Sequence, residues 1–243
     1  MSIDNIFEEW KRNSKCDNFI KDGIINNSLY KNTSLKILSI LQSPPNFLQT
    51  NDFCNEIEEE FFYEYDADEN QKINRYHPIK GVFFNLARWI YAINKLHKNK
   101  IPLFSDVCCQ SIKKYDFAQF FRNSAVIFFN KCNDKKKYSK RKLFKTAMRD
   151  NSLLNREITD IKPNLIICGN TFEIYRKLYE KDIFEQIQNT NFYLHKIYGS
   201  KEIRYVFDFV NPDTNKKSDK LFDKVVSDFS NFEVKNILSK FKS

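Results

Sequence analysis

The sequence contains few of the residues from which common cofactor and nucleophile sites are built. Only four glycines occur in 243 residues, whereas the phosphate loops of Rossmann and P-loop folds need several glycines at fixed spacing. No Gly-x-Ser-x-Gly nucleophile elbow is present either. These absences argue against a dinucleotide-binding domain, a P-loop NTPase and an α/β-hydrolase.

Histidine and cysteine are too scattered to predict a metal site. The three histidines lie at positions 77, 97 and 195, and the six cysteines form no Cys-x-x-Cys pair. Cys168 lies in an apolar segment and is interpreted as a small core residue. We therefore expect no metal and no organic cofactor.

Long hydrophobic runs are also absent. No segment approaches the roughly 20 apolar residues of a membrane span, and the acidic, amphipathic N-terminus is unlike a signal peptide. The sequence thus predicts a soluble, cytoplasmic protein without a membrane partner, and we expect a monomer. A chain of this length buries roughly 70–75% of its unfolded surface. We expect one domain over residues 1–243, with an N-terminal helical extension (1–33) and an α/β core (34–230).

Three short apolar runs, at 35–41, 125–130 and 164–169, predict buried parallel strands, and further strands are predicted at 191–197 and 203–209. Amphipathic helices are predicted around them, at residues 3–15, 52–65, 82–97, 105–121, 140–148, 152–161, 172–180 and from 218 onward, with a looser helical segment at 18–24. Strands alternating with helices predict an α/β fold. We expect a three-layer α/β/α sandwich with a central, mainly parallel sheet of four to five strands.

The net charge of +9 is unevenly distributed. Nine lysines and arginines lie between residues 130 and 149 against the single acid Asp134, whereas residues 52–69 hold nine acids and no base. A basic loop directly after a strand predicts phosphate contacts and nucleic-acid binding. The alternative is a solvated, lysine-rich surface.

Short polar segments follow the predicted strands, where ligands of open α/β sheets bind. Four of them stand out, in this chain order: Gln42-Ser43-Pro44-Pro45-Asn46, Asn130-Lys131-Cys132-Asn133, Cys168-Gly169-Asn170-Thr171 and Asn211-Pro212-Asp213. In order and strand context they resemble the motifs of the uracil-DNA glycosylase superfamily. Segment 41–45 stands in the place of the first motif, Asn130-Lys131-Cys132 is similar to the second, and Asn211-Pro212-Asp213 is similar to an Asn-Pro-Ser form of the last. The resemblance covers residues 34–230 and implies the fold of that superfamily.

The resemblance implies that the protein extrudes a nucleotide from DNA and reads its base in a pocket. Asn130 would pair with the base edge, with Gln42 and Phe47 also at the base. Tyr63, Tyr65 and Phe84 are further candidates for stacking on it, and the alternative for Phe84 is a place in the helix core. The alternative for Asn130 is that it caps the strand and turns the chain.

For catalysis, the resemblance places Ser43 where the family has Asp, Asn or Glu to hold the attacking water. Serine is a poor base at neutral pH, so Asn46 takes this role, or a carboxylate such as Asp66 or Asp68 does. Asn211 would stabilise negative charge on the leaving base. The alternative for Asp66 and Asp68 is a solvated loop.

Contacts to DNA are expected from residues beside these motifs, and the alternative for the lysines is an exposed loop. The predicted set is Lys131, Lys135, Lys136, Lys137, Asn170, Asp213, Asn215, Lys216 and Lys217.

The sequence thus favours a monofunctional DNA glycosylase that removes uracil or a modified base, in DNA repair or antiviral defence. Because Ser43 departs from the family, a nucleic-acid-binding protein that has lost hydrolysis remains an alternative. A third is an unrelated nucleotide-processing α/β enzyme.

Overall fold

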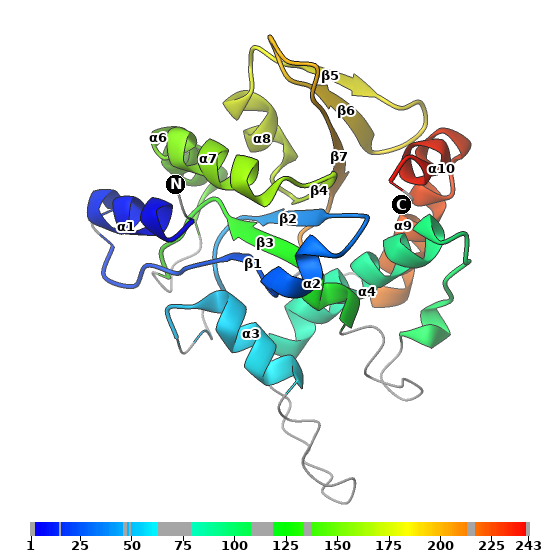
Figure 1. The fold of residues 1–243 in the computed structure, drawn as a ribbon, viewed down its shortest axis with the longest axis horizontal. Coiled ribbons are helices and arrows are strands. Elements are labelled where there is room, and N and C mark those ends of the chain that lie inside the picture. Colours follow the sequence, from blue (N-terminus) through cyan, green and yellow to red (C-terminus); the bar gives the residue numbers. More distant parts are fainter. Residues whose placement is uncertain are drawn as a thin grey trace, which may run out of the picture.

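The computed structural model describes residues 3–14, 16–45, 48, 50–62, 79–107, 119–133, 138–212 and 217–241 (Figure 1). Its centre is a seven-stranded sheet in the order β1-β3-β2-β4-β7-β6-β5. The strands are β1 (Gly23–Ile24), β2 (Ile37–Leu41), β3 (Ser124–Phe128), β4 (Leu165–Gly169), β5 (Ile183–Gln186), β6 (Phe192–Lys196) and β7 (Ile203–Phe209).

The predicted α/β class is confirmed, but the sheet is larger and more mixed than predicted. Strands β3, β2, β4 and β7 are parallel, whereas β1, β6 and β5 join in antiparallel pairs. Of the two strands that the sequence did not predict, β1 has only two residues and β5 is mostly exposed. Neither has the apolar run by which buried strands are recognised.

Most helices follow the predicted periodicity, with ends within a few residues. The helices are α1 (Ile3–Ser14), α2 (Asn27–Lys31), α3 (Phe53–Phe62), α4 (Ile79–His97), α6 (Lys140–Arg149), α7 (Asn151–Ile161), α8 (Phe172–Leu178), α9 (Ser218–Phe229) and α10 (Phe232–Ser239). Of these, α2 and α10 were not predicted. Of the helix expected at 105–121, the described residues form a 3₁₀ turn at Phe104–Asp106 and are helical at 119–122, and residues 108–118 lie outside the described residues. Within the described residues, no helix is long and apolar enough to cross a bilayer.

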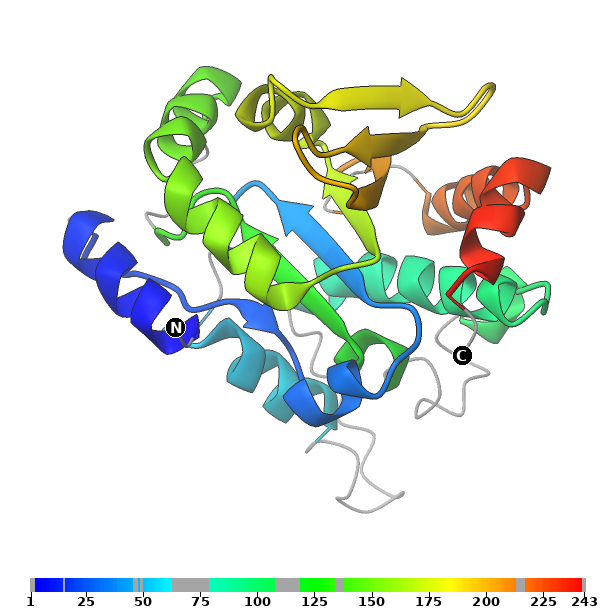
Figure 2. The same cartoon turned by 45° about the horizontal axis from the view of Figure 1, so that its top comes forward.

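Helices pack on both faces of the sheet (Figure 2). Alternate strand residues enter two separate cores, because successive side chains of a strand point to opposite faces. On β3, Val126 and Phe128 join the core under α3, α4, α9 and α10, whereas Ala125 and Ile127 join the core under α1, α6, α7 and α8. Strands buried on both faces explain the continuous apolar runs of the sequence.

The N-terminal segment is part of this architecture. Ile6, Phe7 and Trp10 of α1 are buried in the second core. The helical segment suggested at 18–24 is wrong: its residues form bridges to Cys132 and Asp52 and then strand β1. Polar Asn18 and Asp22 together with Gly23 weaken a helix here, and β1 instead covers the edge of β3.

We predict that Gly169→Ala destabilises the fold. A Cβ at Gly169, the last residue of β4, would lie 2.7 Å from Leu41 Cδ2 and 3.2 Å from Pro212 Cδ. Leu41 is itself buried, so its side chain must move within a packed core, which costs about 1–3 kcal/mol. Urea denaturation would measure this loss, and an unchanged midpoint would contradict the close packing.

Candidate functional site

The ends of the four parallel strands bring the predicted motifs together. We call the described residues 42–45, 130–133, 169–171 and 210–212 the four-loop edge. Hydrogen bonds link its loops in sequence: Asn130 N donates to Gln42 O (3.0 Å), Gln42 Nε2 donates to Asn170 O (3.3 Å), and Asn170 N donates to Phe209 O (2.7 Å). The predicted juxtaposition of these loops is therefore present in the fold.

The first and third loops differ in exposure. Gln42 and Ser43 are half-buried, whereas Asn170 is exposed and has a left-handed backbone with φ 58°. Asparagine tolerates this conformation better than most residues do. The Thr171 hydroxyl donates to Ile40 O (2.8 Å), so it ties the third loop to β2 instead of capping α8.

Asn130 adopts the turn arrangement that was the alternative prediction. Its side-chain Nδ2 donates to Cys132 O (2.9 Å), its Oδ1 accepts from Cys132 N (3.3 Å), and the residue is 2% exposed. These two bonds use one donor and the acceptor of the amide. To hydrogen-bond the edge of a base, the Asn130 amide would have to break its two bonds to Cys132.

The predicted phosphate contact of Lys131 requires correction. Its ammonium is buried, where it pairs with the carboxyl groups of Asp22 and of Glu157 (2.7 Å). It also lies 4.6 Å from the centroid of the Trp10 ring. A side chain enclosed in this way cannot reach a phosphate, because its charge is needed to balance buried acids.

We call Asp22, Lys131 and Glu157 the buried charge cluster. Asp22 Oδ2 also accepts from Phe128 N (2.6 Å). Burial raises the pKa of Asp22 and brings the pKa of Glu157 to about 8. Burial alone would lower the pKa of Lys131, but the two acids hold it above its usual value. One ammonium thus faces two carboxyl groups, of which Glu157 retains its proton at neutral pH.

Helix α4 holds the fourth loop. The Asn85 amide donates to Pro212 O (3.0 Å), and Arg88 donates to Asn85 Oδ1 (3.2 Å). Trp89 packs edge-on against Phe209 with ring centroids 4.7 Å apart. Asn211, the predicted charge-stabilising residue, is half-buried beside them. Neither Asn85 nor Arg88 was predicted for the site, since both have the spacing of an ordinary helix.

The remaining predictions divide into two groups. Lys217 is described and exposed, and Phe84 is half-buried and packs against the first core, with the Arg88 guanidinium 5.8 Å from its ring centroid. The others lie outside the described residues: Asn46, Phe47, Tyr63, Tyr65, Asp66, Asp68, Lys135, Lys136, Lys137, Asp213, Asn215 and Lys216.

No carboxylate occurs among the described residues of the four-loop edge. Asp134 and Asp213 adjoin two of the loops but lie outside the described residues. A described carboxylate close to the edge along the chain is Asp208, near the end of β7, which pairs with Cys168 across the sheet. Burial, with a smaller effect from the charge of Glu173, raises the pKa of Asp208 to about 6. The described part of the edge therefore supplies amides, hydroxyls and backbone groups.

Two further features were not predicted. Cys16 and Cys132 form a disulfide with their Cα atoms 6.0 Å apart, which joins the segment after α1 to the second loop. An open pocket lies between α1 and α7 and is lined by Ile6, Asn155, Arg156, Thr159 and Asp160, none of which was predicted as a site residue. Within the described ranges, no group of three His, Cys, Asp or Glu residues is placed to bind a metal.

No family model matches this sequence, and no curated protein matches it. The resemblance to the uracil-DNA glycosylases is thus carried by the short motifs of the four loops.

We predict that Lys131→Met lowers the free energy of unfolding by about 3–5 kcal/mol, because it leaves two buried carboxyl groups without a cation. Urea denaturation at neutral pH would measure this change. The exposed Lys235→Met serves as the control and should lie within about 0.5 kcal/mol of wild type. Equal effects of the two substitutions would contradict the structural role of Lys131.

We predict that Glu157→Gln reduces the pH dependence of stability. The folded state holds the Glu157 proton up to about pH 8, whereas the unfolded chain releases it near its ordinary pKa of 4.5. Stability conferred by this proton is therefore lost as pH rises through that window. From pH 6 to pH 9, wild type should lose about 2 kcal/mol more than Glu157→Gln in urea denaturation. Parallel pH profiles would contradict the assignment.

Proposed function

We propose that this protein is a DNA glycosylase that extrudes a uracil or modified base and hydrolyses its N-glycosidic bond. The observation that carries the proposal is the meeting of four polar, motif-bearing loops at one edge of the sheet, where the first, second and last resemble uracil-DNA glycosylase motifs. Ligands of open α/β sheets bind at this edge. On this proposal the sheet and its two helical layers form a uracil-DNA glycosylase-like sandwich.

The described side chains suit the binding of a base better than that of a phosphate cofactor. The Asn130 amide has both a donor and an acceptor, which match the edge of a pyrimidine once the bonds to Cys132 are exchanged. In glycosylases, extrusion exposes such an edge. Binding of the base would then be coupled to a rearrangement of the second loop.

Bond cleavage requires stabilisation of an oxocarbenium-like sugar and of negative charge on the departing base. The half-buried Asn211 is held between β7 and Pro212, whose carbonyl is fixed by Asn85. A neutral amide in this position can donate to a base carbonyl across a wide pH range. Ser43 or Asn46 would orient the water.

A second candidate is a nucleic-acid-binding protein of the same fold without hydrolysis. Serine at position 43 and the absence of a carboxylate from the described residues of the four-loop edge favour it. In that case the protein would bind DNA but leave every glycosidic bond intact.

We predict base-specific formation of abasic sites in duplex and single-stranded DNAs that carry uracil, mismatched uracil or hypermodified pyrimidines. Asn211→Ala should lower the excision rate by about 10²–10³, the cost of losing one preorganised donor to a developing charge. Asn130→Ala should remove the preference for the excised base. Alkali-induced strand cleavage would measure both effects.

The matched control is Asn236→Ala, the same substitution at an exposed position of α10. It should retain the wild-type rate, and thermal melting should show that all variants are folded. DNA binding without abasic product across the panel would establish the binding protein instead. A product formed equally by wild type and Asn211→Ala would exclude the proposed role of Asn211.

A further inference from the structure

Helix α6 has an unusual charge distribution. It contains five lysines and arginines and no acidic residue. Leu143 and Ala147 are buried, whereas Lys140, Arg141, Lys142 and Lys145 are exposed. The apolar side of the helix is thus used by the fold, and its outer side is strongly cationic.

This pattern is unfavourable for the isolated helix. Arg141, Lys145 and Arg149 follow one another at spacings of four, which places like charges side by side. Lys140, Arg141 and Lys142 also lie in the first turn, where the helix dipole favours acids. Among the described residues, an ion pair with an acid is found for Arg149 of this helix alone, with Asp150 at 2.7 Å. An anionic partner would offset this repulsion.

Helix α8 extends the cationic area. It packs beside α6 (Figures 1 and 2) and contributes the exposed Lys177 and Arg176. The Arg176 guanidinium lies 3.7 Å from the carboxylate of Glu173 at the surface of the same helix. Two half-buried aromatic rings lie between the cations: Lys177 Nζ is 5.2 Å from the Phe144 centroid, and Lys142 Nζ is 4.1 Å from the Tyr138 centroid. We call this area the α6–α8 basic surface; its residues are Lys140, Arg141, Lys142, Lys145, Arg176 and Lys177.

The position of this surface connects it to the four-loop edge. Helix α8 begins at Phe172, directly after the third loop. A chain of phosphates that crosses the α6–α8 basic surface would therefore reach the loops within a few nucleotides.

We infer that the α6–α8 basic surface binds the phosphate backbone of duplex DNA next to the four-loop edge. The choice of DNA as the polyanion rests on the proposed function. A membrane surface fits less well, because a helix that lies on lipid needs a free apolar face, and Leu143 and Ala147 of α6 are buried in the protein.

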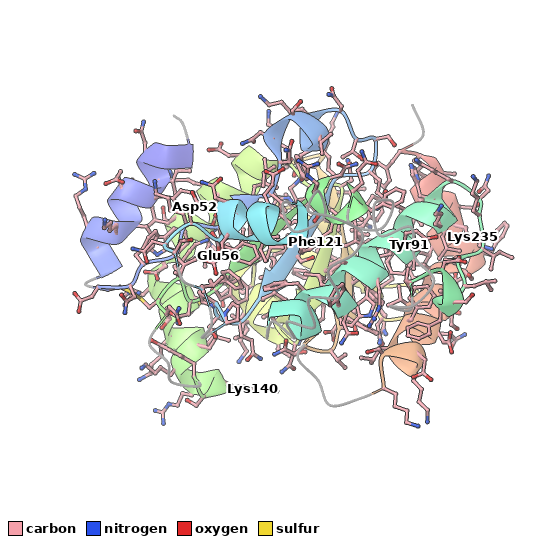
Figure 3. All side chains as sticks on the ribbon, turned by 90° about the horizontal axis from the view of Figure 1, so that it is seen from below. Asp52, Glu56, Tyr91, Phe121, Lys140 and Lys235 are labelled. Carbon is pink, nitrogen blue, oxygen red and sulfur yellow. A yellow bond between two sulfur atoms is a disulfide. The ribbon has the colours of Figure 1, made fainter. Side chains whose placement is uncertain are left out.

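The test is the salt dependence of binding to an unmodified 25-base-pair duplex, followed by fluorescence anisotropy. The variant carries Lys140→Gln, Lys142→Gln and Lys145→Gln. The matched control carries Lys220→Gln, Lys235→Gln and Lys240→Gln, three exposed lysines of the α9 and α10 region. Figure 3 shows Lys140 and Lys235 on well-separated parts of the molecule. Both proteins lose the same net charge.

Each phosphate contact adds about 0.9 to the slope of log K against log salt. The α6 variant should therefore show a slope smaller by about 2–3 and an affinity at least about tenfold weaker at low salt. The control should keep the wild-type slope. Equal losses in both variants, no loss in either, or binding of anionic phosphatidylserine vesicles in place of duplex would overturn the inference.

The duplex contains no base to excise, so this test is separate from that of the proposed function. Loss of binding in the α6 variant without any abasic product in the panel would leave the inference standing and reject the glycosylase. If the α6 substitutions change neither the excision nor the salt slope, the glycosylase stands and the inference about the α6–α8 basic surface is rejected.

Discussion

The burial of one ammonium between two carboxyl groups constrains the whole N-terminal half of this fold. Asp22 comes from the segment before β1, Lys131 from the loop after β3, and Glu157 from α7. Burying the Lys131 ammonium or the Asp22 carboxylate without its partner would cost several kcal/mol, so these segments must meet at the same point. The cluster thereby fixes β1 on the sheet edge and sets the path of the second loop, on which Asn130 lies.

The residues that support the four-loop edge differ from those that are exposed to a partner. The sheet and α4 hold the ends of the four parallel strands through backbone bonds and the Asn85–Pro212 contact. The exposed groups of α6 and α8 lie outside this framework and contribute little to packing. Recognition of a base and attraction of a phosphate backbone would thus use different residues, as in many proteins that bind nucleic acid.

The sequence was informative where burial leaves a periodic pattern. Residues 37–41 and 165–169 are buried on both faces and were found as apolar runs, and the helical spacing of Phe83, Leu86 and Ile90 predicted α4. The sequence was misleading where contacts between distant segments determine the environment of a residue. Lys131 lies in a basic segment and resembles a phosphate ligand, yet its partners are 109 residues before it and 26 residues after it. No local pattern distinguishes a buried lysine from an exposed one. Likewise, β1 and β5 form strands because they pair with neighbouring strands, and not because of a pattern in their own residues.

The same separations along the chain bear on how the protein reaches its native state. Asp22 cannot find both partners until residue 157 has been synthesised, and strand β1 pairs with β3 across about a hundred residues. Contacts of such high sequence separation are slow to form, because closure of the intervening loop precedes any gain from the contact. In the native fold α7 covers the apolar face of helix α1, so Phe7 and Trp10 cannot reach this burial before α7 is present. Its docking therefore belongs to the later steps of folding, although α1 precedes α7 in the chain.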